Sequence, residues 1–174
     1  TDIKGAETKA WLQKLLANDV NKLTTAGKAL YSGMLNEQGG VIDDLIVYLM
    51  NSDETEYRIV SNAATRDKDL AQFNKVAEGF DISITERPEL AMIAVQGPKA
   101  REIVAPFVEG IDLSNEAMPH MSMAIGKICG VPTRLMRMSF TGEAGYEINV
   151  PADHGQMVWD TLYERVAAAG GCAY

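Results

Sequence analysis

The segment GGVIDDLIVYLM, residues 39–50, is the part of the sequence that most directly indicates the fold. It turns the chain at a glycine pair and continues as a strongly apolar strand, which two adjacent carboxylates, Asp43 and Asp44, interrupt. Carboxylates are unfavourable in strands and costly to bury without a partner. Their position inside this strand therefore needs a structural or a functional explanation.

Side-chain alternation separates the two carboxylates. Asp43 shares one face of the predicted strand with Val41, Leu45 and Val47, and Asp44 points to the opposite face. One of them must therefore face whatever the sheet covers. The pair could cap the glycine turn or lie at an open sheet edge, or it could carry chemistry. Because structural carboxylates outnumber catalytic ones, the spacing alone favours the structural explanation.

The composition excludes several classes of protein. The chain has 174 residues, 47% of them hydrophobic, which is enough for one large domain or two small ones. A net charge of -8 argues against nucleic acid or an anionic membrane as the main partner. No signal-peptide or membrane-spanning run is evident, and Cys129 and Cys172 are predicted to be reduced thiols. We therefore expect a cytoplasmic protein, and the few Cys and His residues predict no metal site.

One pattern occurs twice in the chain. IKGAETKAWLQKLL (3–16) and VQGPKAREIVAPFV (95–108) each predict a strand that ends in glycine, followed by a short amphipathic helix. The glycines, Gly5 and Gly97, suit a tight strand-to-helix turn. Matching apolar residues are offset by 92 positions, with Ile3, Leu12, Leu15 and Leu16 corresponding to Val95, Val104, Phe107 and Val108.

The correspondence continues through the next strands. GGVIDDLIVYLM matches CGVPTRLMRMSF (129–140), and YRIVSN (57–62) matches YEINVP (146–151). A helix follows each, with apolar residues Leu70, Phe73 and Ala77 in the first and Trp159, Leu162 and Val166 in the second. We predict an α+β fold of duplicated ferredoxin-like (split βαβ) halves, 1–86 and 87–174. A cleft between such halves would favour a ligand site.

Other polar residues also accompany these strands. Glu147 lies opposite the apolar strand face of YEINVP, beside Asn149, although a hairpin with one outward glutamate is common. Asn62 ends a strand just before a helix, where an N-cap is the more frequent role than a ligand contact. The charged run 66–69 is predicted to be a solvated helix face.

Taken together, these stretches resemble the aminomethyltransferase family, the T-protein of the glycine cleavage system and its relatives. Residues 15–50, 57–70 and 90–98 are similar to a bacterial T-protein. From about Phe107 onward, residues 112–123 and 134–162 are more similar to the folate-binding part of the sarcosine oxidase alpha subunit. This difference suggests a mosaic, either natural or engineered.

The resemblance implies a tetrahydrofolate-dependent aminomethyltransferase core, built on a folate-binding domain of duplicated halves. The one-carbon donor would be an aminomethyl group on the lipoyl arm of a carrier protein, or an imine from a flavin domain in the sarcosine oxidase relatives. The first carboxylate of the family's Asp-Asp pair falls on Asp43, with an implied catalytic role. The glutamate closing the family pattern TGExGxE falls on Glu147, which would hold the pterin ring. Tyr31 and Asn62 match positions that line the folate cleft.

The resemblance also implies that residues are missing at both ends of the domain. T-proteins carry about 50 residues before this point, and a pterin-binding arginine follows the point where this sequence stops. We therefore expect a truncated folate-binding core with weak activity or none. Two alternatives remain, a non-catalytic folate-binding module and a structural or engineered fragment without a ligand. The iron-sulfur repair relative carries a cysteine-containing motif near the TGE position that this sequence lacks.

Overall fold

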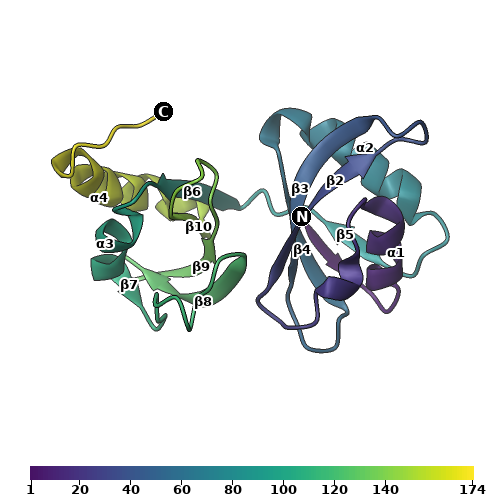
Figure 1. Cartoon of the computed structure of the whole chain (residues 1–174), viewed down its shortest axis with the longest axis horizontal. Coiled ribbons are helices and arrows are strands. Elements are labelled where there is room, and N and C mark those ends of the chain that lie inside the picture. The colour runs from purple at the N-terminus through teal and green to yellow at the C-terminus, as the bar shows by residue number, and fades with distance from the viewer. The chain divides into compact units, whose positions relative to one another are not determined.

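The computed structural model describes residues 1–174, which divide into two compact units, Thr1–Arg87 and Pro88–Tyr174. Each unit contains one five-stranded sheet in which every neighbouring pair of strands is antiparallel. The two helices of each unit lie on one face of its own sheet (Figure 1). No helix has the length and hydropathy that a membrane crossing requires. The chain is therefore a mixed α and β protein with two separate cores.

The sheet of the first unit has the strand order β2-β3-β4-β1-β5. Its elements are β1 (Asp2–Lys4), α1 (Thr8–Leu15), η1 (Val20–Lys22), β2 (Ala29–Leu35), β3 (Val41–Leu49), β4 (Glu56–Ser61), η2 (Ala63–Thr65), α2 (Arg66–Ala77) and β5 (Ser83–Thr85).

The sheet of the second unit has the strand order β6-β10-β9-β8-β7. Its elements are β6 (Leu90–Gln96), α3 (Ala100–Val104), η3 (Ala105–Phe107), β7 (Val108–Glu109), β8 (Ser122–Ile128), β9 (Val131–Arg137), β10 (Gly145–Pro151), η4 (Ala152–His154) and α4 (Gly155–Ala168).

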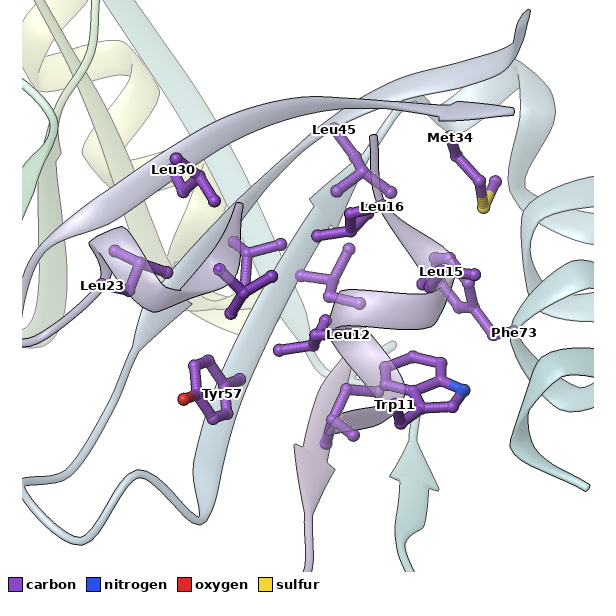
Figure 2. Close-up of a cluster of buried hydrophobic side chains, with 14 of the residues drawn as sticks. Trp11, Leu12, Leu15, Leu16, Leu23, Leu30, Met34, Leu45, Tyr57 and Phe73 are labelled. Atoms are coloured by element: carbon purple, nitrogen blue, oxygen red, sulfur yellow. The ribbon is translucent and has the colours of Figure 1, made fainter. Parts of the chain in front are cut away.

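The core of the first unit forms where α1 and α2 pack on the sheet (Figure 2). Trp11, Leu12 and Leu15 recur at helical spacing on α1, so one stripe of the helix is buried. Trp11 meets Phe73 of α2 edge-on, with 6.0 Å between the ring centroids. This contact joins the two helices over the sheet.

The two units bury corresponding residues. Ile3 and Leu12 of the first unit, and Val95 and Val104 of the second, are all in the cores. The amide of Gly5 donates to the carbonyl of Thr55, just before β4. The amide of Gly97 donates to the carbonyl of Ala144, just before β10, which is the corresponding strand of the second unit. Both glycines have positive φ, +147° and +126°, at the turn into the first helix of the unit.

Strand β3 contains an irregularity that the sequence did not predict. Met34 of β2 pairs with Asp43, but the next residue, Leu35, pairs with Val41, so the register shifts. Asp43 lies on the buried face with Leu45 and Val47, as alternation predicts. Val41 is exposed, and the prediction that it shares this face is wrong because the bulge breaks the alternation ahead of Asp43.

Two predicted helix faces in the second unit also differ from the structure. The helix after Gly97 ends at Val104 and continues as a 3-10 turn containing Pro106, which has no backbone N–H to extend the α-helical ladder. On α4, Val158 and Leu162 face the core, whereas Trp159 is largely outside it and stacks on Tyr163 at 5.8 Å. Of the three predicted core residues of α4, Leu162 and Val166 do pack on the core, and only Trp159 was misplaced, with Val158 buried instead.

The two turn glycines provide a matched test of this packing. A Cβ at Gly5 would lie 2.2 Å from the Asp81 carbonyl oxygen and 2.8 Å from the Ile82 Cα, whereas a Cβ at Gly97 meets nothing within 4 Å. Both Ala variants bear backbone strain of roughly 1–3 kcal/mol. We expect Gly5→Ala to lose about 1–3 kcal/mol more because backbone must also move. Urea unfolding of each unit measures this, and an equal loss at Gly97→Ala would contradict the packing.

Candidate functional site

The carboxylate of Asp43 is buried and held by side chains from two other segments. Only 9% of the residue is exposed. Asn62, which follows β4, donates from Nδ2 to Asp43 Oδ1 at 3.0 Å, and Thr65 Oγ1 lies 2.6 Å from Oδ2. Burial alone would raise the pKa of Asp43, but hydrogen bonds involving Thr65, Asp69 and Asn62 outweigh it and lower the pKa to about 2. Asp43 is therefore ionised at neutral pH.

Asp44 is exposed on the opposite face and forms a different set of contacts. The Tyr31 hydroxyl donates to Asp44 Oδ2 at 2.5 Å, and Asn62 Nδ2 lies 2.9 Å from Asp44 Oδ1. The hydrogen bond to Asp44 raises the pKa of Tyr31, which is itself 54% exposed. Of the four predicted site residues, Tyr31 and Asn62 thus contact the Asp43–Asp44 pair, to which the third, Asp43, belongs.

Asn62 does not use its side chain as the sequence suggested. It occupies the N-cap position of η2, but its side chain makes no capping hydrogen bond. The side-chain amide instead lies between the Asp43 and Asp44 carboxylates. The predicted N-cap bond is wrong because the charge-assisted bonds from Nδ2 to the two carboxylates fix the orientation of the side-chain amide, and its oxygen makes no capping bond.

Asp69 is a member of the site that the sequence reasoning missed. The run 66–69 was predicted to be solvated, but Asp69 has 0% exposure. Its Oδ2 lies 2.9 Å from Thr65 Oγ1, and its buried Oδ1 has no hydrogen-bond partner. Burial, and then the neighbouring Asp43, raise the pKa of Asp69 to about 6. The signal was present, because Asp69 precedes Phe73 by four residues on the apolar stripe of α2.

Glu147 lies on β10, on the face opposite the helices, and is 8% exposed. No hydrogen bond or ion pair engages it, and its buried Oε2 has no partner. Burial raises the pKa of this carboxyl. The side-chain amide nitrogen of Asn149, two residues along on the same face, is also buried without a partner. Buried polar groups are normally hydrogen-bonded, so two orphans on one face indicate a place for an external polar group.

The first unit has a charged pair at the corresponding position, although the buried Nη1 of Arg58 has no hydrogen-bond partner. In the matching register, Arg58 occupies the place of Glu147 and Asp2 the place of Ala94. Arg58 forms a bidentate pair with Asp2, with Nε and Nη2 at 2.6 and 2.8 Å from the two carboxylate oxygens. Glu147 instead faces Ala94 across the strand pair, and an alanine side chain cannot satisfy a carboxylate.

A groove of the second unit lies elsewhere. A groove of about 470 Å³ follows β6 and α4 and is lined by residues that include Met92, Val95, Trp159 and Tyr163. Neither Asp43 nor Glu147 lines it. The interpretation of the site therefore rests on the two carboxylates and their contacts.

Comparisons with known proteins place this arrangement in a family. Aminomethyltransferase T of the glycine cleavage system from Bartonella henselae is 28% identical and superposes with a TM-score of 0.78, over 94% of this chain and 43% of that protein. The chain thus spans less than half the length of this relative. Heterotetrameric sarcosine oxidase from Corynebacterium sp. U-96, in complex with pyrrole 2-carboxylate, shares the fold, with a TM-score of 0.66 at 13% identity over 99% of this chain and 81% of that one.

The family model described as the GCVT N-terminal domain covers the whole sequence, residues 1–174. One continuous match of this kind does not require two parents, so the mosaic origin is still only a hypothesis. Together with the superposition on an aminomethyltransferase of the glycine cleavage system, the match identifies this chain as a member of the GCVT N-terminal domain family.

Proposed function

We propose that the chain is a folate-binding domain of the aminomethyltransferase type, which transfers a one-carbon unit from an aminomethyl or iminium donor to tetrahydrofolate. The observation that carries the proposal is the buried, unpartnered carboxylate of Glu147. An unsatisfied buried acceptor is costly and is expected where a ligand completes the hydrogen bonding. Family membership supports tetrahydrofolate as the ligand.

Glu147 fits the polar edge of a pterin. That edge presents an amino group and a ring N–H as adjacent donors, and one carboxylate can accept from both. The neighbouring Asn149 offers a further unpartnered amide on the same face. Because neither the cross-strand neighbour Ala94 nor any other protein group satisfies Glu147, the carboxylate is available to the ligand without breaking an existing contact.

Asp43 supplies a fixed negative charge in this proposal. Tetrahydrofolate, when bound, supplies the nucleophilic nitrogens that accept the one-carbon unit. A pKa of about 2 keeps Asp43 ionised but makes it a weak base at neutral pH. Its main contribution is therefore electrostatic, through stabilisation of positive charge that develops nearby. Asn62 and Thr65 hold the carboxylate in place, and Tyr31 lines the same region through Asp44.

The donor is proposed to be an aminomethyl group on a lipoyl carrier protein. The support is the likeness to the aminomethyltransferase from Bartonella henselae, whose name places it in the glycine cleavage system. The surface around the Asp43 and Asp44 pair is the place where such a donor would have to approach.

We also propose that the two units are copies of a ferredoxin-like plan. In that plan the first strand lies between the third and fourth, and the second lies beside the third. The order β3-β4-β1-β5 fits it, with β2 as an added edge strand. The order β9-β10-β6 repeats three of these four strands, with β8 added at the corresponding edge. Superposition of experimental structures of the two units, Thr1–Arg87 on Pro88–Tyr174, tests the proposal.

Glu147→Gln tests the pterin contact. The variant keeps the size of the side chain but removes the charge and one acceptor oxygen, so we expect tetrahydrofolate affinity to weaken by roughly 1.5–3 kcal/mol. Glu143→Gln, in the exposed turn before β10, is the matched control and should leave the affinity unchanged. Calorimetric titration of the three proteins measures both. Equal affinities for the parent and Glu147→Gln would remove Glu147 from the site.

Asp43→Asn tests the charge. We expect the single-turnover rate of one-carbon transfer to fall about 10²-fold or more, because the electrostatic contribution is lost while the shape is kept. Tetrahydrofolate affinity should change little, since the charge acts mainly in the transition state. Asp44→Asn is the in-pair control and should retain the rate. If Asp44→Asn abolishes transfer and Asp43→Asn does not, the roles within the pair are reversed.

A further inference from the structure

The hydroxyl of Thr65 bridges two carboxylates, and its single proton cannot serve both. Thr65 Oγ1 lies 2.6 Å from Asp43 Oδ2 and 2.9 Å from Asp69 Oδ2, and 3.1 Å from the carbonyl oxygen of Asn62. A hydroxyl donates one hydrogen bond and accepts through its lone pairs. If both aspartates were ionised, at least one carboxylate oxygen would face the hydroxyl oxygen without a proton between them.

A second proton resolves this conflict, and its place follows from the surroundings. Asp43 also accepts from Asn62, whereas Asp69 has 0% exposure and one oxygen without any partner. The proton therefore belongs on Asp69, whose neutral carboxyl donates to Thr65, and Thr65 in turn donates to Asp43. The pKa of Asp69 is raised to about 6 and the pKa of Asp43 is lowered to about 2, and both shifts agree with a proton on Asp69.

The charged groups that affect the pKa of Asp69 lie on the elements around it. Asp43 of β3 is the like charge, and Lys68 of α2 is the opposite one. The ammonium of Lys68 donates to the Ile42 carbonyl at 2.5 Å. The third element, α1, meets α2 through the uncharged ring of Trp11. The Asp43 charge and burial therefore dominate, and both disfavour a second anion at Asp69.

We propose that Asp69 and Thr65 are positioning residues. A second proton, held between the Asp69 carboxyl and the Thr65 hydroxyl (the shared proton), leaves the hydroxyl's own proton directed at Asp43 and so holds Asp43 as a fixed anion for the proposed one-carbon transfer. Asp69 is not placed against substrate. It acts on Asp43 through a direct hydrogen bond and through Thr65, whose hydroxyl it keeps directed at Asp43. The role in transfer rests on the proposed function, whereas the shared proton is a property of the ligand-free protein.

The shared proton predicts how stability depends on pH. Because folding raises the pKa of Asp69 from 3.8 to about 6, its contribution to stability is fully present below pH 3.8 and is lost as the pH rises through 6. Asp69→Asn keeps an N–H that can donate to Thr65 and cannot ionise. We therefore expect the parent to lose stability relative to Asp69→Asn between pH 4 and pH 7. The urea midpoint of unfolding of the first unit measures this.

Asp67→Asn is the matched control, because it makes the same change on α2 at a side chain that is 94% exposed. It should follow the parent at every pH. If Asp69→Asn also follows the parent, Asp69 is ionised in the folded protein and the proposal fails. If Asp69→Asn does not fold, carboxyl-carbon NMR titration of the parent decides. A midpoint for Asp69 near 6 supports the shared proton, and a midpoint at or below its ordinary value overturns it.

Thr65 variants separate the bridge from simple packing. Thr65→Val keeps the shape but removes the hydroxyl, so the NMR midpoint of Asp43 should rise from about 2, whereas Thr65→Ser should restore the parental value. A midpoint unaffected by Thr65→Val would contradict the bridge. Titration with tetrahydrofolate is a separate arm of the experiment. Failure to bind folate would defeat the proposed function while leaving the result on the shared proton intact.

Discussion

Burial of the Asp43 carboxylate is the constraint on which the first unit's site depends. An ionised carboxylate in an apolar strand is tolerated only when donors replace the lost water. Here the donors come from Asn62 at the end of β4 and Thr65 at the start of α2, so β3, β4 and α2 must meet at one point. The Trp11–Phe73 contact fixes α2 over the sheet and so brings that point into register. In this unit, the packing of the core therefore also determines where the donors to the Asp43 carboxylate lie.

Comparison of the two units shows where the repeated plan was altered. The cross-strand position that holds the Arg58–Asp2 ion pair in the first unit holds Glu147 and Ala94 in the second. The strand edges differ as well. In the first unit β5 pairs with β1, whereas the corresponding edge of β6 pairs with no strand and borders the groove beside α4. An uncharged seven-residue edge such as β6 is normally covered or protected in a folded protein.

Much of this could be predicted from particular residues. Alternation along the strand put Asp43 and Asp44 on opposite faces and Asp43 on the face of Leu45 and Val47, and the family resemblance singled out Asp43. The glycine-to-helix pattern predicted the equivalent turns at Gly5 and Gly97. Val41 was misplaced because a bulge has no clear sequence signal. Asn62 was misassigned because an N-cap is a local property, whereas its real partners are distant in sequence. Asp69 was missed because a run of charges was read as solvated, although its spacing from Phe73 put it on the apolar face.

The central claim is that the buried, unpartnered carboxylate of Glu147 binds the pterin of tetrahydrofolate. The most direct measurement follows the carboxyl-carbon NMR signal of Glu147 during a titration with tetrahydrofolate, with the signal of the exposed Glu143 as the control. We expect the Glu147 signal to shift and to saturate, and the Glu143 signal to stay unchanged. An unchanged Glu147 signal at saturating tetrahydrofolate would contradict the claim.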